Sequence, residues 1–508
     1  MTEHGVKTIS IVMLIILISK IAGLIRNTIV ISFLGTGYDH AAAFHFASVI
    51  PQNFLDVAFA AAISASFIPV YNNFIVSRGR QKADLLANNF NTTILIAAAI
   101  VTLLGFFLSG FIASFLGEEY PNAVEIATTL LRIFMFTIFI TTTTFSITGI
   151  VQSLGEFNMP AAMSLIFNMV VILYTLFFFE RWGVFGLAIA FIVGNILQVM
   201  LLLPSLRKKN FKLKFYINLK DEGLLQILRL TPMALITSWL FPISNMINIF
   251  ILTSYNLETI GQHNAANSLY IVITGFFVLS ITNVLFPKLS KDAAKDIKGF
   301  VQTLSKALSG MMFLLIPMSV GLWFLASPLI VLAYERVAFT TEDSIATAAS
   351  LRFFALGMFG FGLQTLLSRG FFAVMDTKSP LIISFLAIII NIIVVFTTLN
   401  YFGVAAAALA VAVSINFAGI CKYIVMARRY KGFFTSKILL NLIKMLVAAF
   451  IMAAFIYIIN AVLPPMHDIF KVTIIVFTGI IVYFAMSFLL KIQQIQLITT
   501  FFERYKNG

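Results

Sequence analysis

The chain has 508 residues, of which 60% are hydrophobic and only 11% are charged, and its mean hydropathy is +1.01. Soluble domains carry about a quarter charged residues, so this composition excludes a water-soluble globular protein, a disordered chain and a secreted disulfide scaffold. The formal net charge is +14, but nucleic-acid binding is not expected, because in a membrane protein basic residues mainly set orientation. The single cysteine, Cys421, permits no intramolecular disulfide, Cys-rich zinc site or iron–sulfur cluster.

Long apolar runs follow one another along the whole chain. About 20 apolar residues are needed to cross the hydrocarbon core as an α-helix, so the sequence predicts an all-α polytopic membrane protein with about 14 spans. The second span is long enough to be broken or bent at Pro51. The first is too long for a signal-peptide core, and we expect it to remain in the mature protein. The expected spans lie near residues 8–33, 41–74, 90–115, 125–151, 160–179, 184–204, 224–252, 264–287, 302–332, 345–372, 381–400, 404–426, 438–463 and 469–490.

Basic residues are concentrated in every second connection between the spans, whereas the intervening connections carry acids or no charge. The positive-inside rule therefore predicts that both termini are cytoplasmic, which agrees with an even number of spans. The basic residues of these connections are Arg78, Arg80 and Lys82; Arg207, Lys208, Lys209, Lys212 and Lys214; Lys288, Lys291, Lys295 and Lys298; and Arg428, Arg429, Lys431 and Lys437.

The sequence also repeats itself at an offset of 220 residues. Such an offset covers about six helices, an even number, so the two copies share one orientation and are expected to be related by an axis along the membrane normal. This predicts six-helix lobes at 1–205 and 223–426, joined by the basic cytoplasmic loop 206–222, with two additional transmembrane helices and a cytoplasmic tail in 427–508. The corresponding pairs are Arg132 and Arg352, Pro160 and Pro380, and Gly183 and Gly403.

Two such lobes are typical of transporters that work by alternating access. The sequence contains no Walker A, His-Glu-x-x-His or Gly-x-Ser-x-Gly motif, so we expect neither an enzyme nor a cofactor. Without an ATP site, uphill work must draw on an ion gradient, the membrane potential or the gradient of the substrate itself.

The first span carries a polar arc. Lys20 and Arg26 lie deep in it, and with Ser19 and Gly23 they share one side, because residues three and four apart lie on one helix face. A charge within a span costs a few kcal/mol and normally faces a cavity or a partner. The arc predicts an anion-binding wall, with snorkelling or a salt bridge as the alternative. We interpret Asp56 in the second span as their counter-ion rather than as a proton or cation site.

Other polar residues within spans are weaker candidates. Asn245, Asn248 and Asn391 join helices or line a polar cavity, and they are the remaining candidates for ion coupling besides Asp56. Arg132 and Arg352 begin their helices on the outer side, so we expect them to reach the outer interface.

Four segments, Ser19–Arg26, Ala62–Tyr71, Leu285–Ser290 and Arg369–Pro380, resemble the MurJ (MviN) lipid II flippases of bacteria. The last contains Asp376-Thr-Lys-Ser-Pro380, a tight turn in which we expect Ser379 as N-cap and Pro380 at the first helical position. The resemblance implies the fold of the multidrug, oligosaccharidyl-lipid and polysaccharide exporters, with helices thirteen and fourteen forming a hydrophobic groove for a lipid tail.

The same resemblance implies a function in the bacterial cytoplasmic membrane. The substrate would be lipid II, an anionic undecaprenyl-pyrophosphate-linked peptidoglycan precursor, carried from the cytoplasmic to the outer leaflet. Membrane lipids and cell-wall synthesis enzymes would be the further partners.

The sequence departs from the family pattern at several positions. Leu55 and Asp56 stand where relatives often have a basic pair, and Ser268 stands in place of another basic residue. In the first span, Lys20 replaces the usual Arg, and Asn27 the usual acid. The three asparagines replace carboxylates of a sodium site in some relatives. Three alternatives therefore stay open: a flippase for another lipid-linked oligosaccharide, a drug or cation antiporter of the same superfamily, and a non-transporting scaffold.

Overall fold

All regular elements in the described part of the chain are helices. The computed structural model describes residues 3–37, 39–51, 63–117, 119–374, 376–430, 432–433, 436–463 and 468–495. Ten helices within these ranges are long and apolar enough to cross a membrane, which confirms the predicted all-α membrane architecture. The count of about 14 spans stays a prediction.

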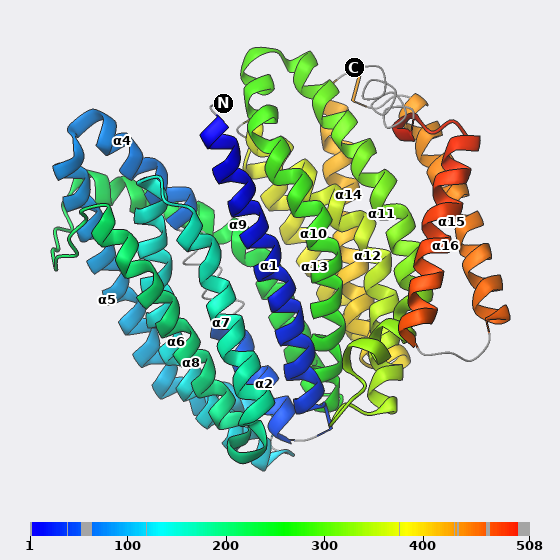
Figure 1. The fold of residues 1–508 in the computed structure, drawn as a ribbon, viewed down its shortest axis with the longest axis horizontal. Helices are drawn as coiled ribbons and strands as arrows, with labels where there is room; N and C mark the ends of the chain where they lie inside the picture. Colours follow the sequence, from blue (N-terminus) through cyan, green and yellow to red (C-terminus); the bar gives the residue numbers. More distant parts are fainter. Residues whose placement is uncertain are drawn as a thin grey trace. The chain divides into compact units, whose positions relative to one another are not determined.

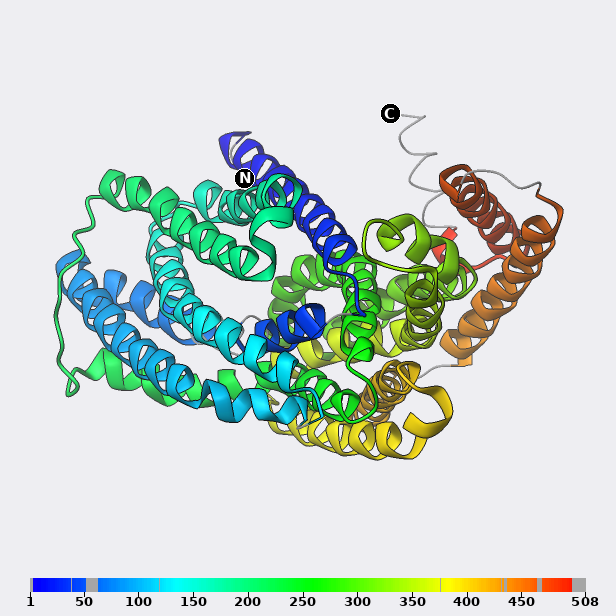
Figure 2. The ribbon, with the colours of Figure 1, turned by 90° about the horizontal axis from the view of Figure 1, so that it is seen from below.

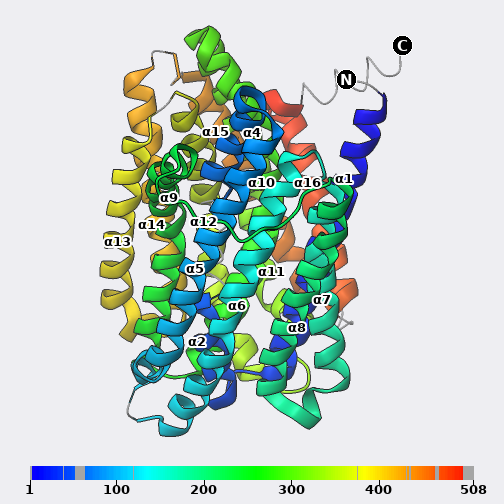
Figure 3. The same ribbon diagram turned by 90° about the vertical axis from the view of Figure 1, so that its left-hand side faces the viewer.

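The chain divides into two compact units. The first comprises Met1–Gly261 with Arg336–Phe339, and the second Gln262–Glu335 with Thr340–Gly508. In the first unit, α1 packs on α7, α7 on α8, α8 on α6 and α6 on α5, and Figure 3 shows α5 to α8 side by side. Its helices are α1 (Glu3–Leu34), α2 (Asp39–Val49), η2 (Ile63–Phe67), α4 (Ile68–Arg78), α5 (Arg80–Ala113), η3 (Ser114–Leu116), α6 (Pro121–Ser153), α7 (Asn158–Phe177), α8 (Phe179–Lys208) and α9 (Glu222–Thr253).

The second predicted span, 41–74, is not one continuous α-helix. Helix α2 ends at Val49, Ile50 and Pro51 are π-helical, and the chain is described again from Ile63 as the π-helix η2, followed by α4. Proline has no N–H to donate and clashes with the preceding turn, which is why an α-helix ends ahead of it. Asp56, the predicted counter-ion, lies outside the described residues.

In the second unit, α12 packs against α11 and α14, and α13 packs against α14. Helices α15 and α16 pack on each other and on α11, and they form a pair at the right of Figure 2. The sequence repeat placed the beginning of the second predicted lobe at residue 223, which lies at the start of α9. In the structure, α9 contacts η2, α4 and α5 and belongs to the first compact unit. The helices of the second unit, green to red in Figure 1, are α10 (Glu258–Lys295, from Gln262 onward), α11 (Ile297–Tyr334), α12 (Thr341–Ala373), α13 (Lys378–Phe402), α14 (Ala405–Arg429), α15 (Ser436–Val462) and α16 (Asp468–Leu489).

The two units repeat local geometry at the predicted offset. Helices α6 and α12 begin and end 220 residues apart. Gly183 and Gly403, at equivalent corners, have φ of +52° and +53°, a conformation that only glycine adopts without strain. Arg132 Nε donates to Ser109 Oγ on α5 at 3.2 Å, and Arg352 Nη2 donates to Ser327 Oγ on α11 at 3.0 Å. The repeat is therefore carried by matching backbone corners and matching hydrogen bonds.

The turn before α13 differs from the prediction. Helix α13 begins at Lys378, so Ser379 is not its N-cap and Pro380 is its third residue. The capping acceptor is Asp376, whose carboxylate accepts from the backbone N–H of Ser379 at 3.0 Å and from its Oγ at 2.6 Å. Arg429 at the end of α14 also forms an ion pair with Asp376. A carboxylate outcompetes a hydroxyl as acceptor here because it binds several donors at once.

Candidate substrate-binding site

The first unit contains a polar cavity of about 580 Å³ between α1 and α7. This volume is within the range of small-molecule sites, about 300–1,000 Å³. The cavity brings together the four residues of the predicted polar arc of α1. The lining residues are Ser19, Lys20, Gly23, Arg26, Gln152, Phe157, Pro160, Ala161, Ser164 and Asn168.

Two hydrogen bonds hold the wall formed by α1 against α7. Ser19 Oγ donates to the carbonyl oxygen of Ala161 at 3.3 Å, and Asn168 Nδ2 donates to the carbonyl oxygen of Ser19 at 3.1 Å. Gly23 lies beside the same amide, since a Cβ at this position would be 3.4 Å from Asn168 Nδ2. Ser19 therefore positions the wall, and Lys20 and Arg26 beside it line the cavity.

The Arg26 guanidinium is held without being neutralised. Its Nε and Nη2 both donate to Asn27 Oδ1, at 3.1 and 2.6 Å. Its Cζ lies 5.1 Å from the ring centroid of Phe167 and 5.8 Å from that of Phe191, within the range of cation–π attraction. Among the described residues it has no acidic partner. The amide of Asn27 therefore orients the guanidinium while leaving its charge intact.

The cavity is electropositive. Lys20 is exposed and has no hydrogen bond or ion pair with any described residue, and the lining carries no acid. A compact ammonium and a planar guanidinium on one wall suit an oxyanion such as phosphate. The neutral polar groups opposite, on α7, can bind uncharged hydroxyls or amides of the same ligand.

The wall formed by α7 was not predicted from the sequence. Ser164 and Asn168 are four residues apart, so they lie on one face of α7 and both line the cavity. That spacing of two polar residues in an apolar span was the available signal. Their pairing with α1 could not be predicted, because it depends on which helices pack together.

The amides proposed for ion coupling are buried in different units. Asn245 and Asn248 belong to α9 in the first unit, and Asn391 belongs to α13 in the second. Neither side-chain atom of Asn248 or Asn391 has a hydrogen-bond partner among the described residues. In the part of the chain that the structure describes, no group of three or more His, Cys, Asp or Glu side chains could hold a metal ion.

Lys422 is a charged residue that sequence reasoning missed. It lies on α14 with only 1% of its surface exposed. Its Nζ donates to three neutral acceptors, Gln364 Oε1 at 3.3 Å, Ser368 Oγ at 3.0 Å and Ser384 Oγ at 3.1 Å. Three donors and three acceptors match, so Lys422 joins α12, α13 and α14 without a carboxylate.

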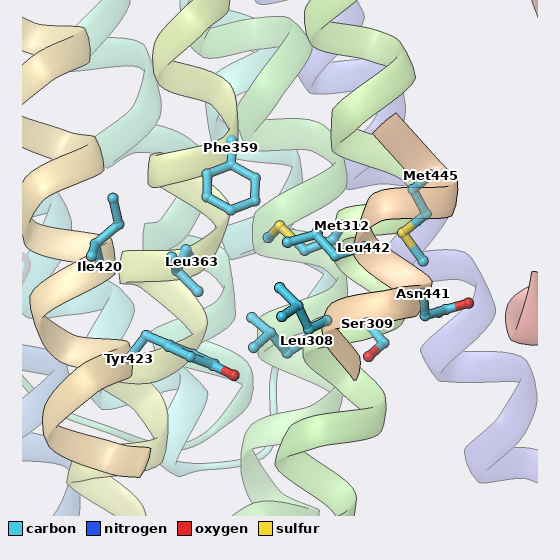
Figure 4. Close-up of a pocket in the computed structure, with 11 residues that line it drawn as sticks. Leu308, Ser309, Met312, Phe359, Leu363, Ile420, Tyr423, Asn441, Leu442 and Met445 are labelled. Carbon is cyan, nitrogen blue, oxygen red and sulfur yellow. The ribbon is translucent and has the colours of Figure 1, made fainter. Parts of the chain in front are cut away.

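The second unit contains two apolar cavities. One, of about 420 Å³, lies between α10, α11, α15 and α16, and Tyr483 donates to the carbonyl oxygen of Phe313 at its wall. The other, of about 150 Å³, lies where α11, α12, α14 and α15 meet (Figure 4). In Figure 4, Phe359, Leu363 and Met312 project into this space. Both cavities suit hydrocarbon rather than a polar ligand.

Known proteins resemble this chain in both sequence and fold. The family model described as "Lipid II flippase MurJ" matches residues 30–478. A Vibrio cholerae protein named "Probable lipid II flippase MurJ" is 29% identical over 434 residues, which cover 82% of this chain and 80% of that protein. A Thermosipho africanus protein named "Lipid II flippase MurJ" is 27% identical over 407 residues, covering 79% and 81%.

Solved structures agree at the level of the fold. The structure titled "Lipid II flippase MurJ, inward closed conformation" has a TM-score of 0.82 at 24% identity, and the match covers 95% of this chain and 99% of that chain. An inward-facing multidrug resistance MATE family transporter of the MOP superfamily has a TM-score of 0.64 at 16% identity, covering 81% and 94%.

Proposed function

The chain belongs to the lipid II flippase MurJ family, and we propose that it carries lipid II from the cytoplasmic to the outer leaflet by alternating access. It is an all-α multi-pass membrane protein. The proposal includes its placement in the bacterial cytoplasmic membrane with both termini in the cytoplasm, as the charges of the connections predict. It also includes contact with cell-wall synthesis enzymes, which would supply or consume the substrate.

The observation that carries the proposal is the cavity lined by Lys20 and Arg26, in which none of the described lining residues is acidic. A pyrophosphate-linked head group brings negative charge, which these two cations would neutralise. Arg26 supplies a planar fork for two oxygens, and Lys20 supplies a point charge. Neutral donors and acceptors on α7 would bind the sugar and peptide. Because the chemistry is binding and release, we expect no catalysed reaction.

The apolar cavity of about 420 Å³ between α10, α11, α15 and α16 supports a place for the lipid tail. Its lining is almost entirely aliphatic and aromatic, with Phe313, Met318 and Ile456 among its residues. An isoprenoid tail is apolar and is more stable against apolar side chains than in water, so a groove of this kind would hold it during passage of the head group. We propose that α15 and α16 provide this groove.

The test is complementation in a bacterium whose own lipid II flippase is depleted. Arg26→Ala and Lys20→Gln should fail to restore growth and should leave lipid II in the inner leaflet. Arg132→Ala is the matched control, since Arg132 also lies in a span and bonds a neutral side chain but does not line the cavity. It should complement fully.

The alternatives give different results in the same strain. If the substrate is another lipid-linked oligosaccharide, the wild-type chain fails to complement although it is expressed, and its deletion in the host leaves that other lipid in the inner leaflet. A drug or cation antiporter changes drug tolerance without altering lipid II. Full activity of both Arg26→Ala and Lys20→Gln would contradict the assignment of the cavity to the head group.

A further inference from the structure

The segment between α8 and α9 forms a strap across α5. We define the strap as residues 211–220; it contains no helix until the turn that precedes α9, and it runs as a thin ribbon along the left edge of Figure 2. The loop was interpreted from sequence only as an orientation signal. Its contacts with α5 give it a specific conformation.

Three polar side chains of α5 bind the strap through its backbone. Asn88 and Asn89 each use the whole amide, one atom as donor and the other as acceptor, and Thr92 accepts one bond. The bonds are Asn88 Nδ2 to Lys212 O (3.1 Å), Lys214 N to Asn88 Oδ1 (2.7 Å), Tyr216 N to Thr92 Oγ1 (3.2 Å), Asn89 Nδ2 to Asn218 O (2.9 Å) and Asn218 N to Asn89 Oδ1 (2.8 Å).

Only even-numbered residues of the strap take part in these bonds. In an extended chain, successive backbone groups point to opposite edges and successive side chains point to opposite faces. Phe211, at the start of the strap, is buried, whereas the odd-numbered residues from 213 to 219 share one face, and all four are large and apolar. Their exposed fractions are 44% for Leu213, 81% for Phe215, 46% for Ile217 and 59% for Leu219. Four apolar side chains in a row on a cytoplasmic loop require an apolar partner.

The strap and the residues just before it are strongly basic. Residues 207–220 contain six cations and no acid. Arg80, at the start of α5, donates to the carbonyl oxygen of Lys209 at 3.2 Å, but its ion pair with Asp84 balances its own charge. The cations are Arg207, Lys208, Lys209, Lys212, Lys214 and Lys220.

The strap lies beside the polar turns of α5 that precede its exposed apolar stretch. Asn88 and Thr92 are in the third and fourth turns of α5, and the exposed apolar residues Ile96, Ile100 and Leu103 follow them. The backbone N–H and C=O groups of the odd-numbered strap residues 213–219 have no partner among the described residues. Unpaired backbone cannot enter hydrocarbon, so the strap fits the head-group region, where water and phosphate oxygens satisfy it.

We propose that residues 207–220 bind anionic phospholipids of the cytoplasmic leaflet. Leu213, Phe215, Ile217 and Leu219 insert between the acyl chains, and the basic residues bind head-group phosphates. A protein strand pairing with the free backbone edge is the competing occupant. The lipid is favoured because the apolar row and the cations occur together at the depth where acyl chains meet phosphates.

The test measures how deeply each strap residue enters the bilayer. In a Cys421→Ser background, single cysteines replace Phe215 or Ile217 as odd positions and Lys214 or Lys220 as even controls, and each is labelled with bimane. The proteins are reconstituted in vesicles of phosphatidylcholine alone or with phosphatidylglycerol at 3:1, each with lipid bearing a doxyl quencher at acyl carbon 5.

We expect at least twofold stronger quenching at the odd positions than at the even positions, and stronger quenching with phosphatidylglycerol than without it. At 1 M NaCl, where the Debye length is about 3 Å, the phosphatidylglycerol effect should vanish while the odd–even contrast remains. The triple variant K212Q/K214Q/K220Q, labelled at position 215, should lose the lipid preference at low salt.

A second variant tests the register itself. Asn88→Ala with Asn89→Ala releases four of the five backbone bonds and should reduce the odd–even contrast, and an unchanged melting temperature shows that the fold is intact. Equal quenching at odd and even positions, or quenching indifferent to phosphatidylglycerol, would overturn the proposal. So would odd positions that stay unquenched in vesicles and become protected when cytoplasmic extract is added, since that identifies a protein strand.

Discussion

Replacing Arg26 by glutamine should weaken substrate binding without destabilising the protein. The guanidinium is oriented by Asn27 and faces Phe167 and Phe191, with no acid among its described partners. The guanidinium is half-buried at the cavity wall and has no described counter-ion, so its partial desolvation is offset only by cation–π contacts of about 0.5–2 kcal/mol each. Glutamine removes the charge and keeps a polar side chain, so the free energy of unfolding should stay equal or rise.

The loss in binding should be large by comparison. A hydrogen bond to a charged group contributes about 1.5–3 kcal/mol, and each 1.4 kcal/mol is a tenfold change in affinity. Losing one such bond to a phosphate oxygen therefore weakens binding about 10- to 100-fold. Arg26→Lys keeps the charge but not the fork, so its affinity should lie between those of glutamine and wild type.

Both quantities can be measured on the same purified protein. Undecaprenyl pyrophosphate binding is followed by thermophoresis in detergent, and unfolding by thermal melting. Arg132→Gln is the control, because it loses a comparable bond to Ser109 and a ring contact with Phe106 outside the cavity. The reasoning is refuted if Arg26→Gln binds as well as wild type. A destabilisation of about 3 kcal/mol or more would instead mean that Arg26 is half of an ion pair, with Asp56 the first candidate partner.

Three further predictions concern stability. Burial raises the pKa of Asp376, but its bonds from Ser379 and Arg429 together lower that pKa below its ordinary value. The stabilisation from this carboxylate is therefore present above about pH 4 and is lost as pH falls through the folded-state pKa. Asp376→Asn should lower the free energy of unfolding by about 1 kcal/mol at pH 7 and by less at pH 3, measured by thermal melting at both pH values. Gly183→Ala and Gly403→Ala should each lower the free energy of unfolding by about 1–3 kcal/mol, because φ is positive at both positions. The control is Gly310→Ala, which has helical backbone and open space around it and should be neutral or stabilising by up to about 1 kcal/mol. Equal melting temperatures for all three variants would contradict this. Lys422→Ala leaves a cavity and should lower the free energy of unfolding by about 2 kcal/mol or more, whereas Lys422→Met fills the space and should lower it by less. The reverse order in denaturant unfolding would show that the charge itself stabilises the protein.

The sequence by itself determined the membrane class, the approximate position of most long helices and the repeat. Spans are predictable because crossing hydrocarbon needs about 20 apolar residues in a row, a local property of the chain. The repeat was visible because Arg132, Gly183 and their counterparts serve the same local geometry in both copies. The four residues of the predicted polar arc share one cavity, since a polar arc on one helix is also a local pattern.

Only the tertiary structure decided what stands opposite that arc. Asn168 and Ser164 line the cavity because α7 packs on α1, and Lys422 is buried because three helices bring neutral oxygens to one point. The strap shows the same limit: its lysines and its alternating apolar residues are present in the sequence, but its conformation against α5 depends on Asn88 and Asn89, more than a hundred residues earlier. Periodicity reports which face of an element is polar, whereas partners are selected by packing between segments distant in sequence, which no local pattern encodes.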